Sequence, residues 1–134
     1  MEQIDFLVVH CSDTPNGRDT HAQDIHRWHL EQGWDGIGYH AVIRLNGEVE
    51  WGRPKYWQGA HANPFNSSSL GICLIGRDDF TEAQFNSLEG LLLSLKLEHP
   101  MASVVGHRDL NSHKTCPNFD VKAWWLEVEK KGID

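Results

Sequence analysis

Basic residues are scarce in this chain of 134 residues. It holds 12 Lys and Arg against 19 Asp and Glu, which gives a formal net charge of −7 with histidine neutral. Proteins whose main partner is a phosphate backbone carry clustered Lys and Arg, so this composition argues against nucleic acid as the partner. Long apolar runs are missing too. None approaches the roughly 20 residues that span a bilayer, and we expect no membrane insertion.

Cysteine is also rare, with only Cys11, Cys73 and Cys116. An odd number excludes a complete disulfide framework. Cys11 and Cys73 lie in apolar runs and are interpreted as small buried hydrophobic residues, a usage that suits a reducing cytoplasm. Residues 1–5 show neither the basic region nor the apolar stretch of a secretory signal, so we expect synthesis in the cytoplasm.

What the chain does contain is typical of a single globular domain spanning 1–134. Hydrophobic residues make up 40% and charged residues 23%, and the length suffices for a core without disulfides. Apolar runs and turn signals predict the order β, α, β, β, β, α, β, α. This order predicts the α/β class, a mixed central sheet of about five strands flanked by about three helices. The expected strands cover 4–10, 38–45, 48–51, 70–75 and 102–105, and the expected helices cover 20–33, 81–99 and 120–132.

Capping patterns predict where the first two helices begin. Thr20 with Gln23, and Thr81 with Gln84, each form the pattern of a capping box. An Asn-Gly pair at 46–47 predicts a tight hairpin between the second and third strands. The second helix carries one apolar stripe, which we expect to face the core rather than a partner. The stripe consists of Phe85, Leu88, Leu91, Leu92 and Leu95.

The densest set of reactive side chains lies toward the carboxyl end. It holds His107, His113, Lys114 and Cys116, and Pro117 stiffens the chain directly after the thiol. A thiol held on a rigid loop near an imidazole is either a nucleophile with its base or part of a pair of metal ligands. A third interpretation is a polar surface loop with one cysteine by chance. This stretch alone leaves all three open.

Other residues carry a similar ambiguity. His10 ends the first expected strand, where it could join a site or make one hydrogen bond to the backbone. Tyr39 is either a core aromatic or a catalytic phenol. The chain also holds six Trp, a residue that is costly to bury and often lines binding grooves. The polar loop that carries Trp57, His61 and Asn66 is therefore interpreted as a groove wall.

Separate motifs agree in order and spacing with one known family over nearly the whole chain. They lie at 8–12, 25–29, 31–34, 38–40, 47–50, 59–62, 70–76, 106–107 and 114–120. On these motifs the chain resembles the type 2, zinc-dependent N-acetylmuramoyl-L-alanine amidases, a family that includes the peptidoglycan recognition proteins. Within that family it most closely resembles the T7-type phage lysozymes. The expected fold is that of the same family.

By this resemblance one zinc ion is bound by His10, His107 and Cys116, with water in the fourth position. Two imidazoles and a thiolate leave an open position, as catalytic zinc sites do. No second cysteine lies near Cys116 to form the Cys pair of a structural zinc site. The resemblance also implies Tyr39 and Lys114 as catalytic groups, which could donate to an oxyanion or help water attack.

The resemblance further implies that His61 contacts substrate, and we expect Trp57 and Asn66 to join it. The sequence departs from the family pattern at two places near these predicted site residues. The segment from His107 to Cys116 is one residue longer than in the T7-type pattern. The run at 66–69 is Asn-Ser-Ser-Ser, which differs from the family's Asn-x-Asn-Ser and weakens any inference about saccharide contacts.

Three other histidines need an interpretation. His29 and His40 recur in the family pattern and are expected to pack behind the site as structural residues. His113 is not explained by the pattern. We expect it to be an exposed imidazole at the mouth of the groove rather than a further ligand, because a catalytic metal needs its open position for water.

The implied activity is that of an endolysin, a peptidoglycan hydrolase in which zinc-activated water cleaves the amide bond between N-acetylmuramic acid and the L-alanine of the stem peptide. One alternative is a non-catalytic peptidoglycan-binding module, although silent relatives typically lack the ligand cysteine and Cys116 is present. Another is an additional role as a regulator, for which a phage RNA polymerase is the partner to test. We expect a monomer that is made in the host cytoplasm and reaches the wall through a holin lesion.

Overall fold

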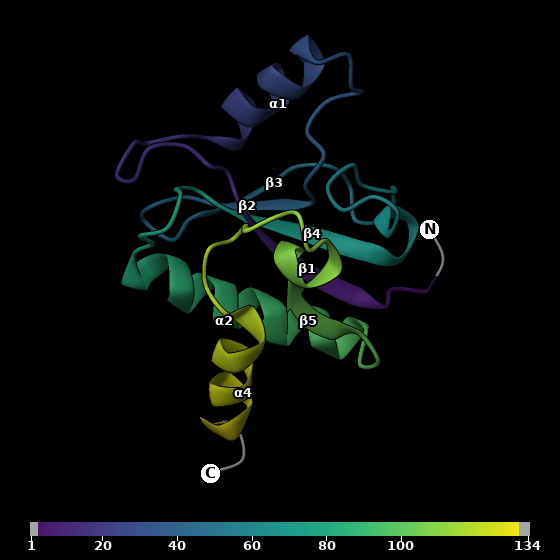
Figure 1. The fold of residues 1–134 in the computed structure, drawn as a ribbon, viewed down its shortest axis with the longest axis vertical. Helices are drawn as coiled ribbons and strands as arrows, with labels where there is room; N and C mark the ends of the chain where they lie inside the picture. Colours follow the sequence, from purple (N-terminus) through teal and green to yellow (C-terminus); the bar gives the residue numbers. More distant parts are fainter. Residues whose placement is uncertain (1–2, 132–134) are drawn as a thin grey trace.

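The computed structural model describes residues 3–131 and arranges them around one five-stranded sheet (Figure 1). The strand order across the sheet is β3-β2-β4-β1-β5. The strands are β1 (Phe6–Cys11), β2 (Ala41–Ile43), β3 (Val49–Trp51), β4 (Ser69–Leu74) and β5 (Ser103–Gly106). The helices are α1 (Ala22–Glu31), α2 (Glu82–Glu98), α3 (His107–Leu110) and α4 (Val121–Lys131), with the short 3-10 helix η1 (Asn66–Ser68) before β4.

The sheet is mixed, and β1 lies inside it between β4 and β5. It runs parallel to both, β4 runs parallel to β2, and β2 and β3 form an antiparallel hairpin across the predicted turn at 46–47. Leu7, Val8 and Val9 are fully buried, because parallel strands of this kind are covered on both faces. The predicted α/β class with a mixed five-stranded sheet is confirmed.

Helices cover both faces of the sheet, α1 on one and α2 with α4 on the other (Figure 1). Val9 of β1 points into the larger core under α2 and α4. The next residue, His10, points to the α1 face, where its register partner Cys73 packs with Ile25 of α1. His10 therefore stands near the carboxyl end of a parallel strand, the edge at which α/β sheets bind their ligands.

The second predicted helix matches its expectation closely. Thr81 N lies 2.9 Å from Oε1 of Gln84, and Gln84 N lies 3.0 Å from Oγ1 of Thr81, so the capping box is confirmed. Leu88, Leu92 and Leu95 of the apolar stripe are buried. The sequence does not predict α3, because one turn of helix is too short to show a helical period.

The predicted start of the first helix is wrong. Thr20 is buried and does not cap the helix, which begins at Ala22 after His21. Oδ2 of Asp24 accepts a hydrogen bond from His21 N at 2.9 Å, and Oε1 of Glu50 accepts one from Ala22 N at 2.8 Å. These two carboxylates satisfy two of the free amides at the start of the helix, the task that the sequence assigns to a capping box at Thr20.

The last helix begins as predicted and ends near the limit of the described residues. Oδ1 of Asp120 accepts a hydrogen bond from Ala123 N at 3.1 Å. Gly132, the predicted end, lies outside the described residues.

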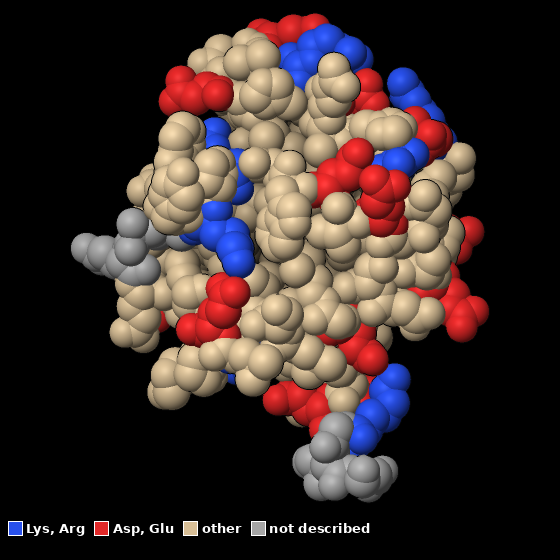
Figure 2. Space-filling model, turned by 180° about the vertical axis from the view of Figure 1, so that it is seen from behind, with Lys and Arg blue, Asp and Glu red and all other residues tan. Residues whose placement is uncertain are grey.

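Within 3–131 no helix has the length and apolar character needed to cross a membrane. On the face opposite that of Figure 1, Lys and Arg are interspersed with Asp and Glu (Figure 2).

Candidate active site

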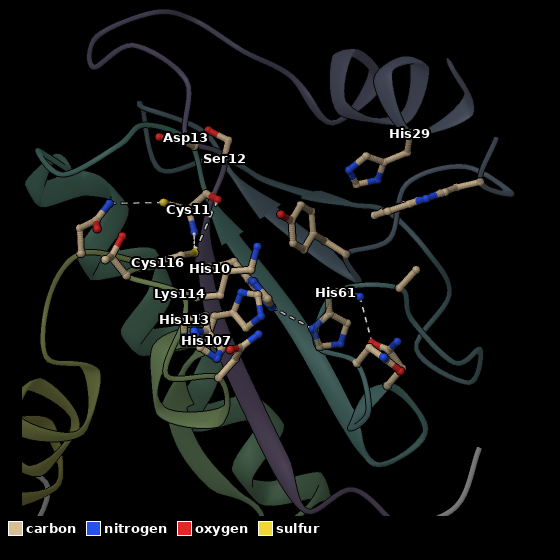
Figure 3. Close-up of a pocket in the computed structure, with 18 residues that line it drawn as sticks. His10, Cys11, Ser12, Asp13, His29, His61, His107, His113, Lys114 and Cys116 are labelled. Atoms are coloured by element: carbon tan, nitrogen blue, oxygen red, sulfur yellow. Dashed lines mark hydrogen bonds between the residues drawn. The ribbon is translucent and has the colours of Figure 1, made fainter. Parts of the chain in front are cut away.

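Two strand ends and one loop bring three potential metal ligands together. His10 lies in β1 and His107 begins α3 directly after β5, so the parallel pairing of β1 with β5 sets them side by side. The loop after α3 carries Cys116 to the same point (Figure 3). The ligand atoms offered by the three side chains all lie within 4.8 Å of one another. The structure thus collects the three residues that the sequence analysis names as zinc ligands.

Backbone contacts hold the Cys116 loop in place. Sγ of Cys116 accepts a hydrogen bond from Cys11 N at 3.0 Å, and Arg108 N donates to the carbonyl oxygen of Cys116 at 2.9 Å. A Cβ at Gly106 would lie only 3.0 Å from Cδ of Pro117. The absence of a side chain at the end of β5 therefore lets the loop pack closely against the strand.

Burial sets the protonation of the three side chains. It lowers the pKa of His10 well below the usual 6.5, and burial together with the Lys114 charge lowers the pKa of His107. Neutral rings keep a nitrogen lone pair for a metal. A hydrogen bond with the side chain of Cys11 and burial raise the pKa of the Cys116 thiol. Its thiolate therefore forms on binding of a cation, with release of a proton.

This donor set fits zinc. Two imidazole nitrogens and one sulfur are ligands that zinc prefers, and catalytic zinc sites combine three protein ligands with one open position. Within residues 3–131 the cluster comprises only these three side chains. They line a cavity of about 740 Å³ that is open to solvent, so a metal held there would be accessible from solvent.

Tyr39 and Lys114 line the same cavity. The ring of Tyr39 lies 5.0 Å from the ring of His10, centroid to centroid. Burial raises the pKa of its phenol well above the usual 10, so the hydroxyl stays protonated and can donate a hydrogen bond. Lys114 is exposed, and its charge acts on His107. The cavity therefore holds one neutral donor and one cation near the three ligands.

His61 lies directly against His10. Nε2 of His10 and Nδ1 of His61 are 2.8 Å apart (Figure 3). Nε2 of His61 lies 3.3 Å from Oγ of Ser69. Burial lowers the pKa of His61 to about 3, so the ring is neutral. His61 lines the cavity, but both of its nitrogens are engaged by the protein itself. The sequence carries no signal for this contact, because it depends on how the 59–66 loop folds onto β4.

Residues 1–119 match the family model of the N-acetylmuramoyl-L-alanine amidases. The chain belongs to this family. The amidase is 42% identical to the endolysin of Klebsiella phage KP32 and 39% identical to the endolysin of Escherichia phage T7, and each match covers 96% of this chain and 89% of the relative. Among solved structures, an endolysin N-acetylmuramoyl-L-alanine amidase from Clostridium intestinale has a TM-score of 0.83 and 29% identity, covering 96% of this chain and 83% of that one. The resemblance read from the motifs is confirmed.

The two other residues predicted to contact substrate lie in different places. Asn66 lines the cavity of the amidase, and its Oδ1 accepts hydrogen bonds from the amides of His61 at 2.9 Å and Ala62 at 2.8 Å. Trp57 is 53% exposed and lines a separate pocket of about 300 Å³ with Trp51. The main cavity thus brings together His61 and Asn66 but not Trp57.

Three histidines of the amidase hold backbone on the α1 side of the sheet. Nδ1 of each accepts a hydrogen bond from a backbone amide, at 3.0 Å in His26 and His29 and at 3.1 Å in His40. His40 is buried, and its Nε2 lies 2.8 Å from the carbonyl oxygen of Trp57. These contacts support the structural interpretation of His40 and add His26 to it. His29 also lines the main cavity, so it does not pack behind the site as expected.

His113 lies on the wall of the amidase cavity, outside the cluster of three ligands (Figure 3). Its side chain is exposed. Its backbone amide donates to Oδ1 of Asn111 at 3.0 Å, which fixes the turn before Cys116. This position agrees with the expected imidazole at the mouth of the groove.

Proposed function

We propose that this chain is a zinc-dependent endolysin that hydrolyses the amide bond between N-acetylmuramic acid and the L-alanine of the peptidoglycan stem peptide. The observation that carries the proposal is the convergence of His10, His107 and Cys116 in an open cavity that Tyr39 and Lys114 also line. Membership of the amidase family supports the choice of bond.

The three ligands divide the work of holding the metal. His10 and His107 offer neutral nitrogens because burial lowers the pKa of both rings. Cys116 gives up its proton and contributes the one negative charge. Zinc held there supplies Lewis acidity, which lowers the pKa of water toward neutrality and polarises a carbonyl group.

Tyr39 and Lys114 stabilise the charge that develops on the carbonyl oxygen during attack. The phenol of Tyr39 stays protonated in its half-buried position and donates a hydrogen bond to that oxygen. The ammonium group of Lys114 adds a positive charge at the exposed side of the cavity. Donors placed where charge develops are worth more in the transition state than in the ground state, which raises the rate.

The cavity wall supplies the groups that hold the muramoyl peptide. Asn63, Asn66 and His113 line the cavity, so sugar hydroxyls and peptide amides meet polar side chains there. Trp57 lines a different pocket. A contact between Trp57 and substrate requires a glycan strand that extends beyond the main cavity.

The similar phage proteins are endolysins, which supports action on the cell wall after release from the host cytoplasm. We propose that release occurs through a holin lesion and that the enzyme acts as a monomer. Binding to a phage RNA polymerase stays a prediction, which a pull-down with purified polymerase tests.

A defined muramoyl peptide tests the proposed reaction. Incubation with N-acetylmuramoyl-L-alanyl-D-isoglutamine should yield N-acetylmuramic acid and a dipeptide with a free alanine amino group, both measured by mass spectrometry. Binding of zinc-loaded protein to peptidoglycan without any amide cleavage would instead establish the binding-module alternative. New reducing ends in digested sacculi would show that a glycosidic bond is cut.

A further inference from the structure

A chain of hydrogen bonds runs from the backbone of the 59–66 loop to the ligand His10. The Ser69 hydroxyl donates to the carbonyl oxygen of Phe65 at 2.7 Å, and its oxygen lies 3.3 Å from Nε2 of His61. Nδ1 of His61 then lies 2.8 Å from Nε2 of His10 (Figure 3). Ser69 uses its one hydroxyl for both of its contacts, whereas His61 uses its two ring nitrogens.

The direction of this chain follows from its first member. A carbonyl oxygen only accepts hydrogen bonds, so the single proton of Ser69 is used on Phe65, the shorter of its two contacts. The Ser69 oxygen must then accept from Nε2–H of His61. A neutral imidazole has one N–H, so Nδ1 of His61 is an acceptor and Nε2 of His10 must be the donor. The lone pair of His10 is left on Nδ1.

We propose that His61 is a positioning residue, which fixes His10 in its Nε2–H tautomer and thereby presents Nδ1 to the metal. The proposal rests on the zinc site of the proposed function. It replaces the expected role of His61 as a substrate contact. A partner that binds the second nitrogen of a ligand histidine sets both its tautomer and its ring orientation, and loss of such a partner typically weakens metal binding.

The surroundings of His61 fix its ring in one place. A Cβ at Gly71 would lie 2.7 Å from Cγ of His61, and a Cβ at Gly59 would lie 2.6 Å from its Cδ2. The ring is therefore wedged against two backbone segments that tolerate no side chain. The amides of His61 and Ala62 both donate to Oδ1 of Asn66, which fixes the loop itself. Such rigidity suits a group that orients a ligand.

Two variants of equal shape separate positioning from packing. Asn and Leu are nearly isosteric, and Oδ1 of Asn stands near the place of Nδ1 of histidine, so His61→Asn keeps an acceptor for His10 while His61→Leu removes it. We expect zinc affinity, measured by competition with a chromophoric chelator, to fall about 10- to 100-fold in His61→Leu. In His61→Asn it should stay within a few-fold of the wild type. Equal affinities in all three proteins, or an equal loss in both variants, would overturn the proposal.

Nitrogen NMR of the wild-type protein tests the tautomer without any substitution. Long-range ¹H–¹⁵N spectra distinguish a protonated, an unprotonated and a metal-bound imidazole nitrogen. We expect His10 to carry its proton on Nε2 in the metal-free protein and to bind added zinc through Nδ1. A proton on Nδ1 of His10, or zinc bound through Nε2, would refute the assignment even if neither variant folds.

These readouts are independent of the reaction itself. If His61 only contacted substrate, His61→Leu would raise KM and leave zinc affinity unchanged. Normal zinc binding with the expected tautomer, but no cleavage of the muramoyl peptide, would refute the proposed function and leave the role of His61 intact. Cleavage with a different His10 tautomer would have the opposite meaning.

Discussion

The histidines on the α1 side of the sheet form two groups that behave differently. In His26, His29 and His40, Nδ1 accepts a hydrogen bond from a backbone amide. The second group consists of His10 and His107, whose ring centroids lie 4.5 Å apart. His10 bonds to the imidazole of His61. In the first group the Nδ1 lone pair accepts a hydrogen bond from the backbone, whereas the second group keeps a nitrogen lone pair available for a metal. The backbone around each ring, rather than the residue type, therefore decides which histidines can hold a metal.

Burial acts on both groups in the same direction. It lowers the pKa of His29 and His40 in the first group and of His10 and His107 in the second. Neutral rings suit both tasks, because a protonated imidazole accepts neither an amide hydrogen nor a metal. His29 and His40 thus differ from His10 and His107 in their partners and not in their charge, so substitutions should separate the two roles cleanly.

The largest effect is expected at the ligand sulfur. Cys116→Ala removes the one anionic ligand, so zinc and amidase activity should both be lost, as measured by metal analysis and by digestion of cell-wall preparations. Cys73→Ala is the control for loss of a thiol, since Cys73 is buried in the core and is not among the residues that line the cavity. One equivalent of tightly bound zinc in Cys116→Ala would contradict the assigned ligand set.

The next effect separates catalysis from metal binding. Lys114→Ala should retain zinc and lose about 10²-fold in kcat, because it removes charge stabilisation in the transition state. Tyr39→Phe, which deletes only the donor hydroxyl, should behave in the same way. The exposed Lys122, on α4, offers the control Lys122→Ala. Digestion at the wild-type rate by Lys114→Ala would show that this residue has no catalytic role.

A smaller effect of another kind is expected in the group that holds backbone. His40→Leu leaves the amide of Gly71 without its acceptor inside the protein, which should cost about 1–3 kcal/mol of the free energy of unfolding. Urea denaturation of the metal-free protein measures this change. Zinc should still bind to the folded variant with one equivalent per chain. Unchanged stability combined with loss of zinc would mean that His40 belongs to the metal-binding group.

The smallest effect is expected at His113. This side chain is exposed on the cavity wall and lies outside the ligand cluster, so His113→Ala should keep its zinc and most of its activity at pH 8. His107→Ala serves as the comparison and should lose zinc. If zinc is instead lost in His113→Ala and retained in His107→Ala, the wrong histidine has been assigned to the metal.

The sequence predicts the sheet and the long helices because their signals are local. Thr81 and Gln84 lie one helical turn apart, and the leucines of α2 repeat with the helical period, so both are visible without the fold. The start of α1 is not predictable in this way. It depends on Glu50, which reaches the first turn from β3, and on Asp24, a residue outside the usual Glu or Gln of a capping box.

The candidate site likewise has a part that the sequence predicts and a part that depends on the folded structure. The family motifs contain His10, His107 and Cys116, and the parallel pairing of β1 with β5 then brings the first two together. The contact between His10 and His61 cannot be predicted from the sequence, because it requires the close approach of the His61 ring to the backbone at Gly71. The sequence also does not predict that Trp57 lines a separate pocket, because the direction of a loop side chain is set only when the loop folds.

Removal and return of the metal test the central claim most directly. The protein is freed of metal with a chelator, and hydrolysis of N-acetylmuramoyl-L-alanyl-D-isoglutamine is followed while zinc is added stepwise. Activity should be absent without metal and should rise in proportion to added zinc until one equivalent per chain is reached. Full activity in the metal-free protein, or none after one equivalent of zinc is bound, would contradict a site in which His10, His107 and Cys116 hold a catalytic zinc ion.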